Sequence, residues 1–360
     1  MERKKKIILI VSLSLASAIV TYFGGGLIAT KIACESMLNV RGSDDSSRDD
    51  IYNLIQYQAD DYPLLQHRKE ISFSYKKETL QGYLYEVNNP KGVIISAHGV
   101  NSFADCSHSA YQNYFVRKGW DVFSFDMIGC GKSTGTMTSL AESRFCVEEA
   151  IKTVKENETT KDLPICLVGH SWGAYGVVSA SGKYQDISAV AAFSGYDQPS
   201  EVMYGFAINY VSPALAITKP AMTFSLAVLE GDKQFYSAKE SIKKNKETSY
   251  IIIQGEEDDV VPTKHYSIYS QVNNKQYENV ETKLITDCKH SYVWNSPEAR
   301  KYILDELFPK IEKLENQYNN KIPMSVVEEF VATVDKEKAS EIDTDLLDYI
   351  NNSFITSLKS

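Results

Sequence analysis

The chain has 360 residues, of which 43% are hydrophobic and 24% charged, a composition that is ordinary for a globular protein with one substantial core. Its formal net charge of -9 argues against nucleic acid as a partner, because phosphate contacts need a clustered excess of Lys and Arg. The six cysteines lie far apart without a C-x-x-C pair, so neither a zinc knuckle nor a dense disulfide framework is indicated.

The N-terminus carries a basic segment, residues 1–6, followed by an uncharged stretch over residues 7–30. At about 1.5 Å per helical residue this stretch spans a hydrocarbon core of roughly 30 Å. Because cationic residues stay on the cytoplasmic side, we expect a single-pass transmembrane signal-anchor in the cell membrane, with residues 1–6 cytoplasmic and the folded domain outside. The alternative is secretion after signal cleavage at Ala16-Ser17-Ala18. The run Gly24-Gly25-Gly26 weakens the helix.

Residues 31–69 are predicted to be a linker and lead-in, since residues 41–50 are small and polar. From residue 70 onward, short β-rich runs alternate with helical segments such as 142–155 and 174–181. The first two runs indicate a hairpin, and the later ones are nearly continuous in apolar residues, as in a parallel sheet covered on both faces. The eight runs are 71–75, 80–87, 92–99, 122–126, 165–170, 188–195, 250–255 and 282–286.

Residues 196–247 interrupt this alternation with a segment that is too long for a plain βα connection. We expect a helical cap there, inserted into a core made of residues 70–195 and 248–319. Helical segments are predicted over 297–318 and over 324–358, the latter within a C-terminal helical extension, residues 320–360, whose function the sequence does not reveal.

The strongest chemical signal is the G-x-S-x-G motif formed by Gly169, Ser171 and Gly173, which follows a β run and precedes a helical one. A sharp strand-to-helix turn forces the serine into strained backbone angles, and only small neighbours leave room for that turn. The exposed hydroxyl would then lie at a helix N-terminus. The motif predicts Ser171 as a catalytic nucleophile.

A serine hydroxyl needs a positioned His to take its proton and a carboxylate to orient the imidazole, in the chain order Ser, acid, His. Only His265 and His290 follow the serine. His265 falls in a predicted surface helix over 263–271, whereas His290 follows the last strand, where the base belongs. Asp258, in the loop after the strand over 250–254, is the predicted acid, and Asp197 is the alternative.

The oxyanion hole requires two backbone N–H groups aimed at the developing negative charge. Trp172, directly after the nucleophile, is predicted to supply one. Val100, in the His98-Gly99-Val100 loop after the strand over 93–97, is predicted to supply the other. We expect His98 to hold that loop by hydrogen bonding.

With these motifs, the chain resembles the α/β-hydrolase superfamily over about residues 70–309, and particularly its monoacylglycerol lipase-like, carboxylesterase-like and serine aminopeptidase-like members. The HGV, GHSWG and GEEDDVVP segments carry the resemblance, together with Asp126 and a G-x-G-x-S turn over 129–133. Many members have His where this chain has Cys130. The resemblance implies an α/β-hydrolase fold with a mostly parallel eight-stranded sheet, helices on both faces and a cap. No cofactor and no metal are expected.

The predicted activity is cleavage of carboxylic esters by a Ser-His-Asp acyl-enzyme mechanism. A peptidase or amidase, an acyltransferase and a non-catalytic membrane-tethered scaffold of the same fold are the alternatives. The cap is rich in aromatic side chains, which either line an apolar pocket or only pack the cap onto the sheet. Membrane anchoring favours small-molecule, lipid-like esters such as monoacylglycerols. These aromatic residues are Tyr204, Phe206, Tyr210, Phe224 and Phe235.

Overall fold

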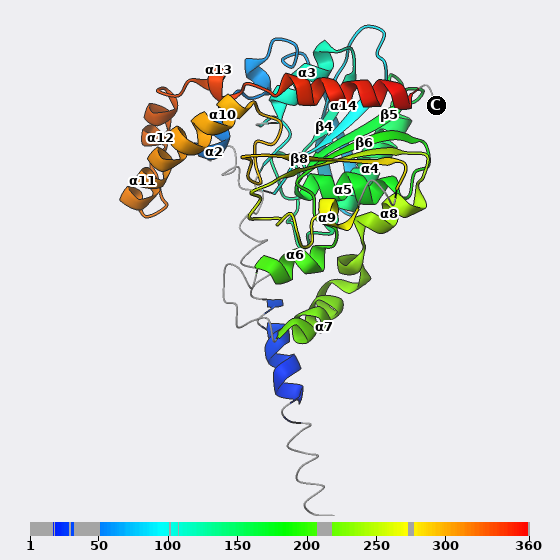
Figure 1. Cartoon of the computed structure of the whole chain (residues 1–360), viewed down its shortest axis with the longest axis vertical. Coiled ribbons are helices and arrows are strands. Elements are labelled where there is room, and N and C mark those ends of the chain that lie inside the picture. The colour runs from blue at the N-terminus through cyan, green and yellow to red at the C-terminus, as the bar shows by residue number, and fades with distance from the viewer. Residues whose placement is uncertain are drawn as a thin grey trace, which may run out of the picture.

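The computed structural model describes residues 17, 19–28, 30–31, 51–100, 102–106, 108–206, 218–272 and 277–358. A twisted sheet forms its centre, with helices on both faces and two further groups of helices at its periphery (Figure 1). One peripheral group holds α6 and α7, and the other holds α10 to α13.

The sheet has eight strands in the order β1-β2-β4-β3-β5-β6-β7-β8. The first two form an antiparallel hairpin, β2 pairs antiparallel with β4, and every other pair is parallel. The predicted mostly parallel, eight-stranded sheet is therefore confirmed. The strands are β1 (Lys69–Tyr75), β2 (Glu78–Tyr85), β3 (Val93–Ala97), β4 (Asp121–Phe125), β5 (Ile165–His170), β6 (Ile187–Phe193), β7 (Ser249–Gly255) and β8 (Val280–Ile285).

Helices pack on both faces of the sheet, which explains why its central strands are buried at nearly every position and mostly apolar. Leu167 belongs to one buried cluster and its neighbours Cys166 and Val168 belong to another, because successive strand side chains point to opposite faces. The first face is covered by α4 (Glu142–Glu156), α5 (Trp172–Ser181) and α8 (Ala238–Lys244). The second is covered by α3 (Ser109–Arg117) and α14 (Thr344–Ser357).

The predicted cap is helical where the structure describes it. It contains α6 (Pro199–Phe206), α7 (Lys219–Glu230) and the 3-10 helix η5 (Gly231–Phe235), and residues 207–217 lie outside the described residues. Helix α8 falls within the predicted cap range but packs against α5 of the core.

The smaller helices lie in the lead-in, before β8 and after it. They are α2 (Ile51–Leu54), η2 (Ala59–Asp61), α9 (Ile268–Gln271), α10 (Pro297–Lys301), the π-helical turn η6 (Tyr302–Leu307), α11 (Phe308–Tyr318), α12 (Met324–Val331) and α13 (Lys336–Ala339).

The helical segment predicted over 324–358 is helical but broken, because the chain forms α12, α13 and α14 in succession. Asp335 and Asp343 start α13 and α14 as N-caps, each carboxylate accepting a backbone N–H from the first turn. Helix α14 is part of the core, because it covers one face of the sheet. Its Asn351 side chain accepts a hydrogen bond of 2.9 Å from the indole N–H of buried Trp120.

The predicted membrane anchor over 7–30 is described only in part, since residues 7–16, 18 and 29 lie outside the described residues. Residues 19–28 are helical. Within the portion of the chain that the structure describes, no helix is both long and apolar enough to cross a membrane.

Two histidines, His108 and His170, are buried among aromatic side chains. The ring of His108 lies 4.9 Å from that of Trp294 and 5.7 Å from that of His170. Burial lowers the pKa of both imidazoles, and the neighbouring His290 contributes for His170, whose pKa falls to about 3. The folded protein therefore holds both rings neutral at mildly acidic pH.

This burial predicts a pH-dependent stability that His170→Gln should reduce. Between pH 6.5 and about 3 the unfolded chain binds a proton at residue 170 that the folded chain does not, so the free energy of unfolding falls with decreasing pH. The variant should lose a slope of up to about 1.4 kcal/mol per pH unit in urea unfolding. The exposed His265 gives a matched control, since His265→Gln should keep the slope. Equal slopes in all three proteins would contradict the assignment.

Candidate active site

Ser171 lies at the turn between β5 and α5 with a backbone φ of 53°, in the left-handed region that costs energy for any residue other than glycine. The two flanking glycines make the turn possible. A Cβ atom on Gly169 would lie 2.5 Å from the Gly173 carbonyl oxygen, and one on Gly173 would lie 2.1 Å from that of Ala97. The predicted strained strand-to-helix turn is confirmed.

The three residues predicted as a triad form one hydrogen-bonded chain. The Nε2 atom of His290 lies 2.8 Å from the Ser171 hydroxyl oxygen, and its Nδ1 atom lies 2.9 and 3.0 Å from the two Asp258 carboxylate oxygens. All three residues are buried, with only 9% of the serine accessible to solvent. Because an ionised carboxylate only accepts hydrogen bonds, Nδ1 carries the imidazole proton and Nε2 accepts from the serine.

Four neighbouring groups contact the Asp258 carboxylate, which lies in the loop after β7. One oxygen accepts backbone N–H groups from Val260 at 3.0 Å and Val261 at 2.8 Å. The other accepts the side-chain amide of Gln254 at 2.7 Å. Both oxygens contact the His290 ring as well. These donors hold the Asp258 carboxylate in the position from which it orients the imidazole ring of His290.

Asp197, the alternative acid, makes different contacts. One of its carboxylate oxygens accepts the Ser237 hydroxyl at 2.7 Å and the backbone N–H of Lys239 at 2.8 Å. It therefore fastens the start of α8 to the loop after β6, and the structure brings Asp258 rather than Asp197 to His290.

His265 is exposed, as predicted, although the helix predicted around it is shorter than expected. The helix α9 begins only after Ser267, whose hydroxyl accepts the backbone N–H of Ser270 as an N-cap. The residues before it form turns, so the predicted helix over 263–271 is wrong in its first half.

The loop predicted to supply part of the oxyanion hole runs beside the serine. A Cβ atom on Gly99 would lie 3.0 Å from the His170 ring and 3.4 Å from the Ser171 Cβ atom, so a larger residue would have to displace these side chains by a few tenths of an ångström. Val100 follows in the same loop. Trp172 is the first residue of α5, where backbone N–H groups have no intrahelical acceptor.

His98 holds this loop in place, as the sequence predicts. Its Nε2 atom accepts the backbone N–H of Met127 at 2.9 Å. The proton of the neutral ring is then on Nδ1, which lies 2.7 Å from the Gly99 carbonyl oxygen and donates to it.

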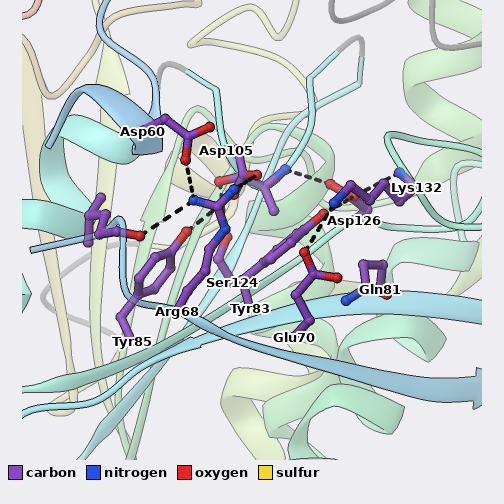
Figure 2. Close-up of polar contacts among 12 residues, drawn as sticks. Asp60, Arg68, Glu70, Gln81, Tyr83, Tyr85, Asp105, Ser124, Asp126 and Lys132 are labelled. Carbon is purple, nitrogen blue, oxygen red and sulfur yellow. Dashed lines mark hydrogen bonds and ion pairs between the residues drawn. The ribbon is translucent and has the colours of Figure 1, made fainter. Parts of the chain in front are cut away.

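Asp126 supplies a second attachment for the same loop, which the sequence did not reveal (Figure 2). Its fully buried carboxylate accepts the backbone N–H of Ala104 at 2.8 Å and that of Lys132 at 2.9 Å. Gly131 has a φ of 51°, and a Cβ atom there would lie 2.3 Å from the carboxylate. The G-x-G-x-S turn thus wraps around Asp126, and an acidic residue directly before such a turn is the signal that could have indicated it.

An ion pair next to Ala104 joins the lead-in to this loop. The Arg68 guanidinium lies 3.1 Å from the buried Asp105 carboxylate, which also accepts the Tyr85 hydroxyl at 3.2 Å (Figure 2). Burial is the largest single influence on the pKa of Arg68, and it acts to lower it. Attraction to Asp105, with further contributions from Asp60 and Tyr85, outweighs burial, so the net pKa is raised.

His170, the variable residue before the nucleophile, also contributes to the site. Its Nε2 atom lies 2.9 Å from the His290 carbonyl oxygen and donates to it, because a carbonyl can only accept. This contact fixes the backbone of the histidine that faces Ser171. Sequence reasoning had assigned His170 no role, since the motif allows any residue there.

The cap contains a cavity of about 210 Å³ between α6 and α7. Of the predicted aromatic residues, Tyr204 and Phe235 line it, together with Met222 and Leu226. Phe224 lies instead on the outer surface of α7. Tyr210 and the side chain of Phe206 lie outside the described residues.

Polar groups complete the lining of this cavity. They are Gln198, Ser200, Glu201, Lys219 and Thr223. In the part of the chain that is described, no group of three or more His, Cys, Asp or Glu side chains is arranged to hold a metal ion.

Residues 88–214 match the family model described as serine aminopeptidase, S33. No curated protein matches the chain. Among solved structures, an α/β hydrolase from Vibrio vulnificus is similar with a TM-score of 0.51 and 14% identity, over 77% of this chain and 91% of that one.

Two esterases are similar at lower TM-scores. The Pyrococcus furiosus esterase Pf2001 gives 0.49 with 19% identity, over 74% of this chain and 91% of its own. Est1E from Butyrivibrio proteoclasticus, solved with bound ferulic acid, gives 0.47 with 18% identity, over 67% of this chain and 99% of its own. With the family match, the sheet order and the turn at Ser171, the chain belongs to the α/β-hydrolase superfamily and is an enzyme of that superfamily.

Proposed function

We propose that the protein is a serine hydrolase that cleaves carboxylic esters through an acyl-enzyme. The observation that carries the proposal is the hydrogen-bonded chain from Ser171 through His290 to Asp258, which has the geometry that serine activation requires.

In the first half of the proposed reaction, the Ser171 oxygen attacks the ester carbonyl carbon while His290 Nε2 takes the serine proton. The backbone N–H groups of Trp172 and Val100 stabilise the oxyanion, and Asp258 stabilises the imidazolium. The carbon–oxygen bond to the alcohol then breaks, and the alcohol leaves with the proton from Nε2. In the second half, water attacks the acyl-enzyme, His290 takes its proton and returns it to the serine, and the carboxylic acid is released.

The proposed substrates are small esters with an apolar acyl chain, such as monoacylglycerol-like lipids. Four apolar or aromatic side chains in the cap cavity support this class: Tyr204, Met222, Leu226 and Phe235. The family model described as a serine aminopeptidase favours peptide or amide cleavage as a second candidate on the same three residues. Transfer of the acyl group to an acceptor other than water would use the same intermediate.

We also propose that residues 7–30 anchor the protein in the cell membrane with the catalytic domain outside. The support is the uncharged stretch preceded by four basic residues, Arg3 to Lys6. Secretion after signal cleavage is the alternative.

Ser171→Ala should abolish covalent labelling by a fluorophosphonate probe, because the probe reacts with an activated serine hydroxyl and alanine has none. The measurement is in-gel fluorescence of the purified protein. Ser194→Ala serves as a control, since Ser194 is buried at the end of β6 and should leave labelling intact. Labelling that survives in Ser171→Ala would exclude this residue as the nucleophile and favour the scaffold alternative.

Asp258→Asn should lower kcat by about 10⁴-fold, the effect that loss of the orienting carboxylate has in serine proteases, because an amide favours the wrong tautomer of His290. Asp197→Asn is the matched control. Its carboxylate oxygen accepts a backbone N–H at the start of α8, a role that an asparagine oxygen can also fill, so the change should leave kcat close to that of the unmodified enzyme. If steady-state kinetics showed the large loss of kcat in Asp197→Asn instead, Asp197 rather than Asp258 would be the acid that orients His290.

With p-nitrophenyl esters from acetate to decanoate, kcat/KM should rise with chain length until the cavity is full. Each buried methylene should contribute up to about 0.8 kcal/mol, or roughly fourfold. Activity that is highest with acetate and falls steadily would identify a small-acyl esterase instead. The corresponding p-nitroanilides provide the comparison for the second candidate, because faster cleavage of the anilides would favour an amidase.

A further inference from the structure

The outward-facing surface of α7 has the apolar composition that is typical of a buried helix surface. No charged residue occurs between Lys219 and Glu230, at the two ends of the helix. Three of its large apolar side chains are exposed, Phe224 by 49%, Val228 by 57% and Leu229 by 40%. The other exposed positions of this face are Pro220, Thr223 and Ala227.

The opposite face of α7 packs on the protein, so the outward face is not simply the core-facing stripe of an amphipathic helix. Ala221, Met222, Ser225 and Leu226 are buried on that inner face. A surface helix normally carries polar and charged residues opposite its buried stripe. Helix α7 is apolar on both faces, which indicates that something other than water covers the outer one.

The helical residues 19–28 extend this apolar surface, because they pack against α7 (Figure 1). The rings of Phe23 and Phe224 meet edge to face, with their centroids 5.2 Å apart. Gly26 lies directly against Ala221, where a Cβ atom would come within 2.7 Å of the alanine Cβ. Gly26, the last residue of the glycine run, therefore allows this close contact.

Three large aliphatic side chains of this N-terminal helix are exposed beside α7. They are Ile19 at 49%, Val20 at 71% and Ile28 at 64%. Together with the exposed side chains of α7 they form the cap apolar surface, defined here as Ile19, Val20, Ile28, Phe224, Val228 and Leu229.

We propose that the cap apolar surface lies in a lipid bilayer and docks the cap on the membrane. The sequence before it favours lipid over a second copy of the chain. Residues 7–18 continue the uncharged stretch, and Arg3 to Lys6 stand before it. An apolar run ended by cations matches acyl chains bordered by anionic headgroups.

The consequence of membrane docking for substrate supply rests on the proposed function. Met222 and Leu226, on the inner face of α7, line the cap cavity, while Phe224 and Val228 on the outer face contact lipid. The cavity is then separated from the bilayer by a single helix. An apolar ester dissolved in the membrane reaches the cap without crossing water, which removes most of the desolvation barrier that a long acyl chain meets.

The docking is tested with the full-length protein reconstituted in vesicles of phosphatidylcholine and phosphatidylglycerol. Val228→Trp places a fluorophore on the cap apolar surface, and the three native tryptophans are buried. Vesicles containing brominated phosphatidylcholine should quench at least half of the added emission. Met324→Trp is the matched control, because Met324 is exposed by 41% on α12, in the other peripheral group of helices, and should show no added quenching.

Equal quenching of the two variants, or none for Val228→Trp, would overturn the docking. A concentration-dependent dimer without quenching at residue 228 would also overturn it and identify the surface as a contact between copies.

A second variant separates docking from catalysis. The double substitution Phe224→Asp with Val228→Asp should lower hydrolysis of p-nitrophenyl decanoate held in vesicles by tenfold or more, and leave hydrolysis of soluble p-nitrophenyl acetate unchanged. Unchanged activity on the vesicle-bound ester would contradict a role of docking in substrate supply. If the unmodified enzyme hydrolyses neither ester, the proposed function fails, while the quenching measurement still decides the docking.

Discussion

The site depends on the strained turn that holds Ser171 between a strand and a helix. A positive φ at a serine persists only where the surroundings leave no alternative. Here Gly173 lies against the carbonyl of Ala97, so the first turn of α5 contacts the end of β3. The same contact brings the loop after β3 beside the serine. One steric constraint therefore positions both the predicted nucleophile and the predicted oxyanion donors.

Around this turn, each loop of the site is held by a group that takes no part in the proposed reaction. His98 and Asp126 bind the loop after β3, Gln254 binds the acid, and His170 binds the backbone of His290. Such supporting contacts keep the reacting groups within the small tolerances that catalysis requires.

The eight strands and the meeting of Ser171, His290 and Asp258 were predictable because each is marked locally, by an apolar run or by a motif at a strand end. The breaks before α13 and α14 were also marked, by the N-caps Asp335 and Asp343, but the helical spacing of apolar and charged residues continues across both breaks.

The role of α14 and the donation from His170 to His290 were not predictable, since both join positions more than a hundred residues apart. No local pattern encodes such contacts. Phe224 was expected either to line a pocket or to pack the cap onto the sheet, and it is exposed instead. The sequence of an apolar helix does not specify which of its faces is buried.

The packing of α14 on the sheet also has a consequence for the timing of synthesis. Trp120 and its partner Asn351 are separated by 231 positions in the chain. At about 5–20 residues per second, a ribosome needs roughly 10 to 50 s to make the intervening segment. During that interval one apolar face of the nascent sheet lacks the part of its cover that α14 supplies, so chaperones that bind exposed strands have a defined window in which to act on this protein.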